Sequence, residues 1–172
     1  MKSRARTDYR RALAQFTTGV TIVTTRTAAG SPTGLTVNSF NSVSLDPPLI
    51  LWSLSLKAGA LPAFRDCPSY AINVLAADQL ELAKRFALRG VDRFAGTEWH
   101  AGPGELPVIN GSVATLIAQN RNQHLEGDHI IFVGEVTEFD VTGGPPLVFH
   151  DGRYIASATE APLPRAFRKP WR

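Results

Sequence analysis

The sequence holds one cysteine, Cys67, among its 172 residues. A single cysteine excludes an intrachain disulfide, a Cys-x-x-Cys redox pair and a zinc site built from several thiolates. No apolar run approaches the roughly 20 residues that a helix needs to cross a bilayer, and no signal-peptide apolar region follows the basic N-terminus. These absences predict a cytoplasmic protein.

Several catalytic motifs are also missing. No glycine-rich dinucleotide fingerprint follows a strand, because GPGELP at 102–107 has proline and leucine where that motif needs freedom or glycine. There is no P-loop, no GxSxG nucleophile elbow and no helical HExxH pair. A metal site remains conceivable only at HLEGDH (124–129), where a polar hairpin tip is the favoured interpretation.

The net charge of +3 is unevenly distributed along the chain. Nine of the 18 basic residues lie in two short ends, where Asp8 is the only acid. These basic residues are Lys2, Arg4, Arg6, Arg10, Arg11, Arg165, Arg168, Lys169 and Arg172. The body from 12 to 164 then carries 9 basic and 14 acidic groups, a balance of 9 − 14 = −5. An acidic body argues against nucleic-acid binding, which concentrates positive charge on the folded surface.

Length and composition predict one domain. Hydrophobic residues make up 44% and charged residues 19%, as in ordinary globular proteins. We expect a single domain over 1–156, followed by a basic, proline-containing tail at 157–172.

The chain order predicts mostly strands. A helix capped by Thr7, with Tyr9, Leu13 and Phe16 on one face, precedes a β-branched strand at 20–26, and GLTV at 34–37 should form a hairpin with it. Further strands are expected at PLILWSL, YAINVLA, SVATLIAQN and HIIFVGEVTEFDV, and a closing Asp-Gly hairpin at LVFHDGRY. Gly134 indicates a bulge or a close backbone approach.

The other expected elements are a helix and a loop. Asp78 and Glu81 predict the start of a helix with Leu82, Ala83 and Phe86 on one face and Gly90 as its stop. A Glu81–Arg85 pair at i, i+4 would support it. Residues 91–111, punctuated by glycine and proline, indicate a long functional loop. Many strands without βαβ alternation predict an antiparallel barrel.

The most unusual stretch is GLTVNSFNSVSLDPP, from Gly34 to Pro48. It contains four hydroxyl side chains within nine residues and no lysine, arginine or glutamate. Such a surface offers neutral hydrogen bonds to a flat, polar-edged ligand or a phosphate, although a serine-rich exposed strand edge explains the stretch about equally well. We expect its prolines to take it out of the sheet before PLILWSL.

This stretch resembles the flavin-binding segment of the flavin reductase family. Three further matches follow in the family's order, YAINVLAADQLELAKRFA at 70–87, DRFAG at 92–96 and GDHIIFVGEV at 127–136. The resemblance spans about residues 9–154. It implies a mainly β fold, the antiparallel Greek-key split β-barrel that binds FMN, with a few flanking helices.

The resemblance also implies a set of site residues. Thr36, Val37, Asn38, Ser39 and Ser42 would lie along the flavin, mostly through backbone groups. Ser53, Ser55 and Lys57 would lie near its phosphate, Phe94 near the ring system, and His129 on the nicotinamide side as the catalytic residue. Each also has a simpler interpretation, as exposed strand serines, ordinary core for Phe94 and a surface strand start for His129.

The implied activity is reduction of FMN or FAD by NADH or NADPH, with hydride passing to flavin N5 and reduced flavin going to a separate monooxygenase. A homodimer is implied as well, while the residue patterns themselves favour no metal, no membrane and no nucleic acid. Two departures from the family bear on this, KAGALPAF in place of a hydroxyl-rich phosphate segment, and LIAQN where relatives often carry a cysteine. The alternatives are an electron carrier of the same fold without nicotinamide activity, and an interaction or nucleic-acid module that uses the basic ends.

Overall fold

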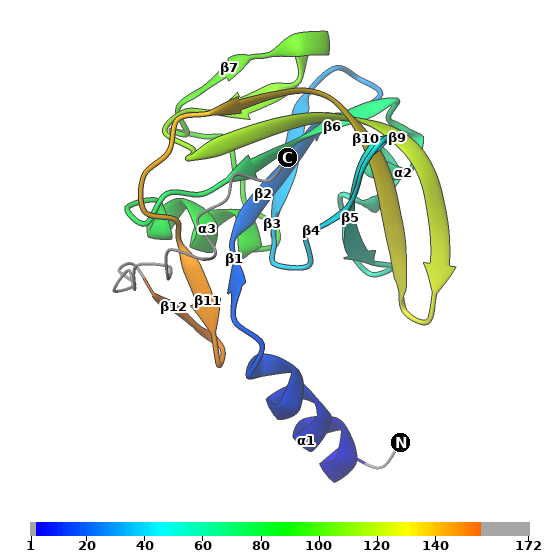
Figure 1. The fold of residues 1–172 in the computed structure, drawn as a ribbon, viewed down its shortest axis with the longest axis vertical. Coiled ribbons are helices and arrows are strands. Elements are labelled where there is room, and N and C mark those ends of the chain that lie inside the picture. Colours follow the sequence, from blue (N-terminus) through cyan, green and yellow to red (C-terminus); the bar gives the residue numbers. More distant parts are fainter. Residues whose placement is uncertain (1–2, 156–172) are drawn as a thin grey trace.

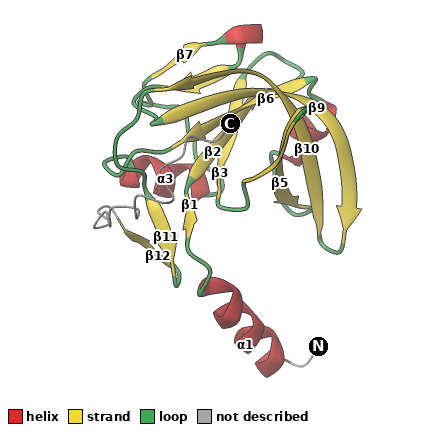
Figure 2. Cartoon of the chain, in the orientation of Figure 1, coloured by secondary structure: helices red, strands yellow, loops and turns green. Residues whose placement is uncertain are grey.

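The computed structural model describes residues 3–155, with side chains from residue 7 onward. Strands dominate this part of the chain (Figure 2). The tail predicted at 157–172 lies outside the described residues. None of the described helices is long and apolar enough to cross a membrane.

A seven-stranded antiparallel sheet forms the body, in the order β3-β2-β6-β9-β10-β5-β4. Its strands are β2 (Thr21–Arg26), β3 (Pro32–Val37), β4 (Asn41–Leu45), β5 (Pro48–Ser55), β6 (Ser69–Val74), β9 (Ala114–Glu126) and β10 (His129–Val141). The sheet curls until its two outer strands, β3 and β4, lie on the same side of the molecule (Figure 1). This arrangement confirms the antiparallel split barrel that the sequence predicts.

Smaller elements flank the barrel. One three-stranded sheet joins β1 (Thr18–Gly19), β11 (Val148–His150) and β12 (Arg153–Ile155), and a ribbon joins β7 (Trp99–Ala101) to β8 (Pro107–Ile109). The helices are α1 (Ser3–Ala14), α2 (Leu61–Asp66), α3 (Leu80–Ala87) and the 3-10 turn η1 (Pro103–Glu105). The predicted loop at 91–111 therefore contains a ribbon and a turn, and the predicted Asp-Gly hairpin joins β11 to β12.

The barrel core is built around aromatic rings. The Trp52 indole stacks on Phe132 with 4.6 Å between ring centroids, and it meets Phe64 and Tyr70 edge-on at 5.1 and 5.5 Å. All four side chains are fully buried. A second cluster, containing Phe86 and Ile22, fills the space between α3 and the outer face of the sheet. Two buried clusters thus fix β2, β3 and α3 relative to one another.

Gly134 occupies the position that the sequence predicted as a bulge or a close approach. The register between β10 and β9 shifts between Val133 and Gly134. A Cβ atom added to Gly134 would lie 2.3 Å from the Tyr70 hydroxyl oxygen and 3.0 Å from the Ala118 Cβ. Both halves of the prediction are confirmed, because only glycine leaves room for the buried Tyr70 side chain.

Apart from residues 38–40, which connect β3 to β4, the hydroxyl-rich stretch stays in the sheet up to Leu45, so the prediction that it leaves the sheet before PLILWSL was wrong. Asn41–Leu45 forms β4, the edge strand that pairs with β5. Its prolines do not break the pairing, because the Asp46–Pro47 peptide lies in the turn and Pro48 begins β5. An edge strand hydrogen-bonds on one side only, so it tolerates the bulge between Ser42 and Ser44.

Three local details of helix α3 also differ from expectation. Helix α3 starts at Leu80, with Gln79 rather than Asp78 at its N-cap, and the Gln79 side-chain oxygen accepts from the Ala76 amide. It ends at Ala87, before the glycine predicted as its stop. Glu81 pairs with Lys84 at 2.6 Å instead of with Arg85, whose guanidinium donates to the Ala95 carbonyl at 2.8 Å.

Candidate functional site

The barrel is open along one seam. Strand β4 covers β5 only from Pro48 to Leu51, so the last part of β5, Trp52–Ser55, has β10 on one side and no strand on the other. Strand β3 is the other edge of the sheet. Ser39 bridges the gap, since its hydroxyl donates to the Ser53 carbonyl at 3.1 Å and accepts from the Ser53 amide at 3.0 Å. We call this opening the split.

A cavity of about 310 Å³ lies at the split. Its walls come from the end of β3 and the residues after it, the end of β5, the segment before α2, the end of α3 and the start of β10. The lining residues are Leu35, Thr36, Val37, Asn38, Ser39, Ser53, Leu54, Ser55, Ala58, Gly59, Ala60, Phe86, Ala87, Arg89, Arg93 and His129. We call it the split cavity.

Most of the site residues expected from the sequence meet at this cavity. Seven of them line it, from three separate strands and the loop after β3. They are Thr36, Val37, Asn38, Ser39, Ser53, Ser55 and His129. His129 lies opposite Ser55 in the β10–β5 register, which explains how a residue so distant in sequence reaches the same cavity.

The hydroxyl groups of this cavity differ in what they already bind. Thr36 donates to the Ala83 carbonyl of α3 at 2.7 Å, and Ser39 spans the split. Ser55 accepts from the Lys57 amide at 3.3 Å. Within residues 3–155, neither the Ser53 hydroxyl nor the Asn38 amide group has a hydrogen-bond partner. These two polar groups are therefore available to a ligand.

Three of the expected residues lie elsewhere. Ser42 is an exposed residue of β4 opposite Ile50, and Lys57 is exposed on the turn after β5. Phe94 packs edge-on against Phe86 and Trp99, with ring centroids 5.1 and 5.8 Å apart. None of the three lines the split cavity. Their assignment to the flavin site stays a prediction.

The wall formed by α3 and the chain after it was not among the residues expected from the sequence. Phe86, Ala87, Arg89 and Arg93 line the split cavity from that side. Arg93 lies in the DRFAG motif, so that motif could have identified it. Nothing in the local pattern distinguishes Arg89 from the other basic residues near the end of α3.

The two arginines give the split cavity a positive character. Arg93 donates from Nη1 to the Gly34 carbonyl at 2.7 Å and from Nε to the Leu88 carbonyl at 3.0 Å, so it fastens the loop to β3. Burial lowers the pKa of the Arg93 guanidinium, and the charge of nearby Arg89 lowers it further. Arg89 is exposed and makes no hydrogen bond or ion pair with the described residues. No carboxylate lines the cavity, so its cations favour an anionic ligand.

His129 is the first residue of β10 and lines the split cavity from that strand. Its Nδ1 lies 2.7 Å from a carboxylate oxygen of Asp128, and its side chain is half-exposed. This contact orients the ring while the other ring nitrogen remains available. Among residues 3–155, no group of three or more His, Cys, Asp or Glu side chains is placed to hold a metal ion.

Comparison with known proteins gives a consistent result. The family model described as "Flavin reductase like domain" matches residues 13–157. FMN reductase (NADH) SmoA of Agrobacterium fabrum is 45% identical over 147 residues, which cover 86% of this chain and 83% of that protein. The flavin-dependent monooxygenase reductase subunit HsaB of Rhodococcus jostii is 34% identical over 95% of this chain and 82% of its own. The NADH:FAD oxidoreductase SgcE6 of Streptomyces globisporus, solved with NAD and FAD fragments, superposes with a TM-score of 0.86 at 35% identity, covering 94% and 98% of the two chains.

Proposed function

This chain belongs to the flavin reductase-like family, and we propose that it reduces flavin with NADH at the split cavity. The observation that carries the proposal is the meeting of seven expected site residues with two arginines in one cavity free of carboxylates. Flavin mononucleotide and flavin adenine dinucleotide are flat, polar-edged and anionic. The walls of the split cavity match these three properties.

The polar groups of the split cavity match different parts of such a substrate. The Ser53 hydroxyl, the Asn38 amide and the backbone of Thr36–Ser39 supply neutral hydrogen bonds to a ring edge. Arg89 supplies the cation for a phosphate. Leu35 and Ala87 supply apolar surface, which favours the stacking of a planar ring over a hydrated ion.

The bound cofactors supply the reactivity, because NADH delivers a hydride to the flavin ring. The protein's part is to orient the two rings and to exclude competing geometries. His129 stands at the rim of the split cavity, and we assign it to the nicotinamide side. Its imidazole donates or accepts a hydrogen bond there without being consumed in the transfer.

Reduced flavin is the product, and we propose that a separate flavin-dependent monooxygenase receives it. The naming of HsaB as a reductase subunit of such a monooxygenase supports this partner. Because the reaction consumes NADH, the proposal places the protein in the cytoplasm.

We also propose a homodimer as the working form. Helix α1 projects from the body (Figure 1), and it is tied at its end through the Asp151 amide, which donates to the Ala14 carbonyl at 2.9 Å. Its apolar residues Tyr9 and Leu13, and Phe16 just after its end, are 57, 56 and 76% exposed. A helix of 12 residues is marginal alone in water, so a second copy is the partner that would cover this stripe.

The decisive experiment measures NADH oxidation by the purified protein with FMN, FAD, riboflavin or no flavin. We expect oxidation to depend on flavin and to exceed the background of free flavin with NADH. NADPH serves as the comparison donor. A protein that binds flavin yet oxidises neither nucleotide would be the electron carrier of the same fold, and the proposal would fail.

A further inference from the structure

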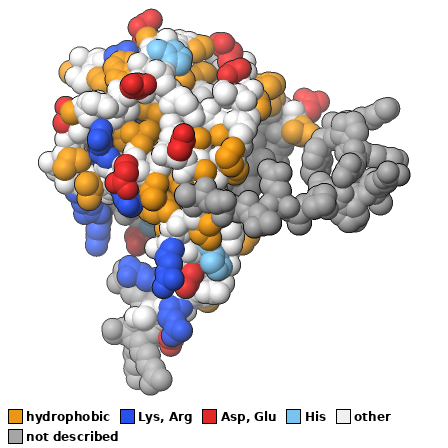
Figure 3. Space-filling model, turned by 90° about the vertical axis from the view of Figure 1, so that its left-hand side faces the viewer, with side chains coloured by type: hydrophobic (Ala, Val, Ile, Leu, Met, Phe, Trp, Pro, Cys, Tyr) orange, Lys and Arg blue, Asp and Glu red, His pale blue; other side chains and the backbone are white. Residues whose placement is uncertain are grey.

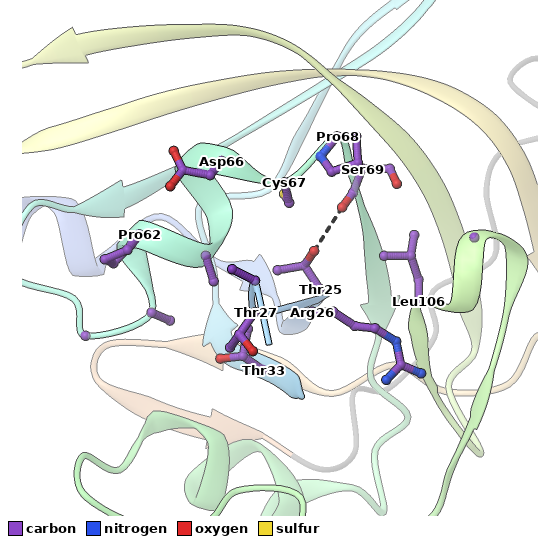
Figure 4. Close-up of a pocket in the computed structure, with 15 residues that line it drawn as sticks. Thr25, Arg26, Thr27, Thr33, Pro62, Asp66, Cys67, Pro68, Ser69 and Leu106 are labelled. Carbon is purple, nitrogen blue, oxygen red and sulfur yellow. Dashed lines mark hydrogen bonds between the residues drawn. The ribbon is translucent and has the colours of Figure 1, made fainter. Parts of the chain in front are cut away.

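A second and larger cavity lies beside the split cavity. It measures about 490 Å³ and is bounded by the β2–β3 hairpin on one side and by α2 and the start of β6 on the other (Figure 4). Gly104 and Leu106, at and just after η1, close a third side. None of its residues belongs to the site set that the sequence indicated. We call it the hairpin cavity.

The two cavities adjoin each other. They share Gly59 and Ala60 in their walls. Strand β3 also runs past both, with Thr33 lining the hairpin cavity and Leu35 lining the split cavity. Two residues of a strand span roughly 7 Å. A single extended molecule can therefore occupy both cavities across the small side chains of the shared wall.

The walls of the hairpin cavity suit a flat, uncharged ring with polar edges. Apolar surface comes from Ala60, Pro62, Ala63, Pro68 and Leu106. Thr25 already donates to the Ser69 carbonyl at 3.0 Å, as Figure 4 shows. The Thr33 and Ser69 hydroxyls, in contrast, form no hydrogen bond with any residue of the described chain, and both residues line the hairpin cavity. Apolar walls with a few unused hydroxyls are typical of small-molecule sites.

The charges of the hairpin cavity differ from those of the split cavity. Its two charged residues are Arg26 and Asp66, which balance. The Arg26 guanidinium is already engaged, since Nη1 donates to the Gly30 carbonyl at 2.8 Å, Nε donates to the Glu105 carbonyl, and the group lies 5.7 Å from the Trp99 ring centroid. Asp66 is exposed and forms no ion pair with the described residues. A carboxylate in this position accepts hydrogen bonds from a sugar diol and disfavours a phosphate.

We propose that the hairpin cavity binds the adenosine part of a dinucleotide whose phosphates and reacting ring lie toward the split cavity. The inference extends the proposed function, because both FAD and NADH carry adenosine. The charge distribution gives the direction, with the phosphates placed toward Arg89 and the neutral nucleoside beside Asp66. FMN has no adenosine, so it occupies the split cavity alone.

Two bulky substitutions from opposite walls test the proposal. Ala63→Phe on α2 and Thr33→Phe on β3 each fill the hairpin cavity, and Ala101→Phe, on the exposed ribbon strand β7, is the matched control. Flavin fluorescence gives the Kd of FMN and of FAD, and steady-state assays with FMN give the KM for NADH. Circular dichroism and urea unfolding establish that each variant is folded.

If the adenosine belongs to FAD, both variants raise the Kd for FAD at least tenfold and leave that for FMN within twofold. If it belongs to NADH, the KM for NADH rises at least tenfold and the two flavins bind as before. Either result supports the proposal and identifies the source. Unchanged FAD affinity and unchanged NADH KM in either folded variant overturn it.

A probe that needs no turnover separates this inference from the proposed function. Adenosine and AMP are titrated into the unmodified protein by calorimetry, with and without saturating FMN. We expect adenosine to bind in both cases, and Ala63→Phe to abolish that binding. If the unmodified protein binds adenosine but oxidises no NADH, the cavity assignment stands and the reductase proposal fails. If adenosine does not bind at millimolar concentration, the cavity assignment is overturned even when no variant folds.

Discussion

Arg89 and Arg93 line the same cavity but have different tasks. Arg93 donates hydrogen bonds to the Gly34 and Leu88 carbonyls. Replacing it would therefore remove contacts that hold the loop after α3 against β3, in addition to any contact with a ligand. Arg89 lines the cavity and makes no hydrogen bond or ion pair with the described residues. A guanidinium without protein partners beside an open cavity is the group best placed to bind a phosphate.

We therefore expect Arg89→Ala to weaken FMN binding about tenfold, equivalent to about 1.4 kcal/mol of binding free energy. Riboflavin, which lacks the phosphate, should bind as it does to the unmodified protein. Fluorescence titration with both flavins measures the difference. Lys57→Ala is the matched control, because Lys57 is the phosphate contact that the sequence suggested and it does not line the split cavity. An equal loss for both flavins, or a loss confined to the Lys57 variant, would contradict the assignment.

His129 gives a second prediction at the same scale. His129→Ala should lower kcat/KM for NADH about tenfold while the Kd of FMN stays within twofold, because the ring stands at the rim of the split cavity rather than among the β3 groups. His124→Ala is the control, since His124 is exposed on β9 and lies outside that cavity. Identical kinetics in the His129 variant and the parent would return this residue to the role of an ordinary surface histidine.

Strand β10 requires glycine at one position, Gly134. Its bulge at Gly134 leaves space for Tyr70, whose hydroxyl is buried without a hydrogen-bond partner. Burial raises the pKa of Tyr70, so the hydroxyl stays protonated and neutral in the folded protein. The strand, the glycine and the tyrosine thus form one packing unit in the barrel core.

Gly134→Ala should lower the free energy of unfolding by about 2 kcal/mol, because the new Cβ would overlap the Tyr70 hydroxyl. Tyr70→Phe alone should be nearly neutral, since the lost hydroxyl makes no hydrogen bond. In the double variant the cost of the alanine should fall, although the ring carbon and Ala118 remain 3.0 Å away. Urea unfolding of the four proteins measures this coupling, and strictly additive effects would refute the contact.

The elements also show what the sequence could predict. β-Branched runs predicted β2 and β10 correctly, and Gly134 predicted the bulge in β10. Both predictions succeed because these signals are local in the sequence. The edge strand β4 was missed because its pairing with β5 overrides the prolines at its end. Helix α3 was found, but its start was misplaced, because Gln79 is the N-cap residue and its side chain binds the preceding Ala76 amide instead of capping the helix.

The candidate site divides in the same way. The β3 residues and Ser53 were accessible through the hydroxyl-rich pattern and the family resemblance. Phe86 and Arg89 were not, because they reach the split cavity only through the packing of α3 onto β3. The hairpin cavity is invisible in the sequence for the same reason, since its walls come from four separate segments.

At the scale of the whole molecule, the exposed apolar side chains of α1 are the basis for predicting a dimer. Basic side chains gather on the narrow extension that this helix forms below the body (Figure 3), while its apolar stripe lies exposed. We expect sedimentation to give a particle of twice 18.7 kDa that persists on dilution. Leu13→Asp should dissociate it, because a carboxylate would replace an apolar contact, whereas Arg11→Asp on the opposite face should not. A stable monomer that binds flavin and oxidises NADH would refute the dimer.

The split has a consequence for how the barrel itself can be monitored. Its walls include β3, at one end of the sheet order, and β5, which lies next to the other end, and the hydrogen bonds between Ser39 and Ser53 hold the seam. A ligand bound in the split contacts both walls, so its affinity depends on the distance between them. Mild denaturant that frays the sheet margins should release flavin before the aromatic core opens. Flavin fluorescence would then measure the opening of the split, and the fluorescence of the buried Trp52 would measure global unfolding.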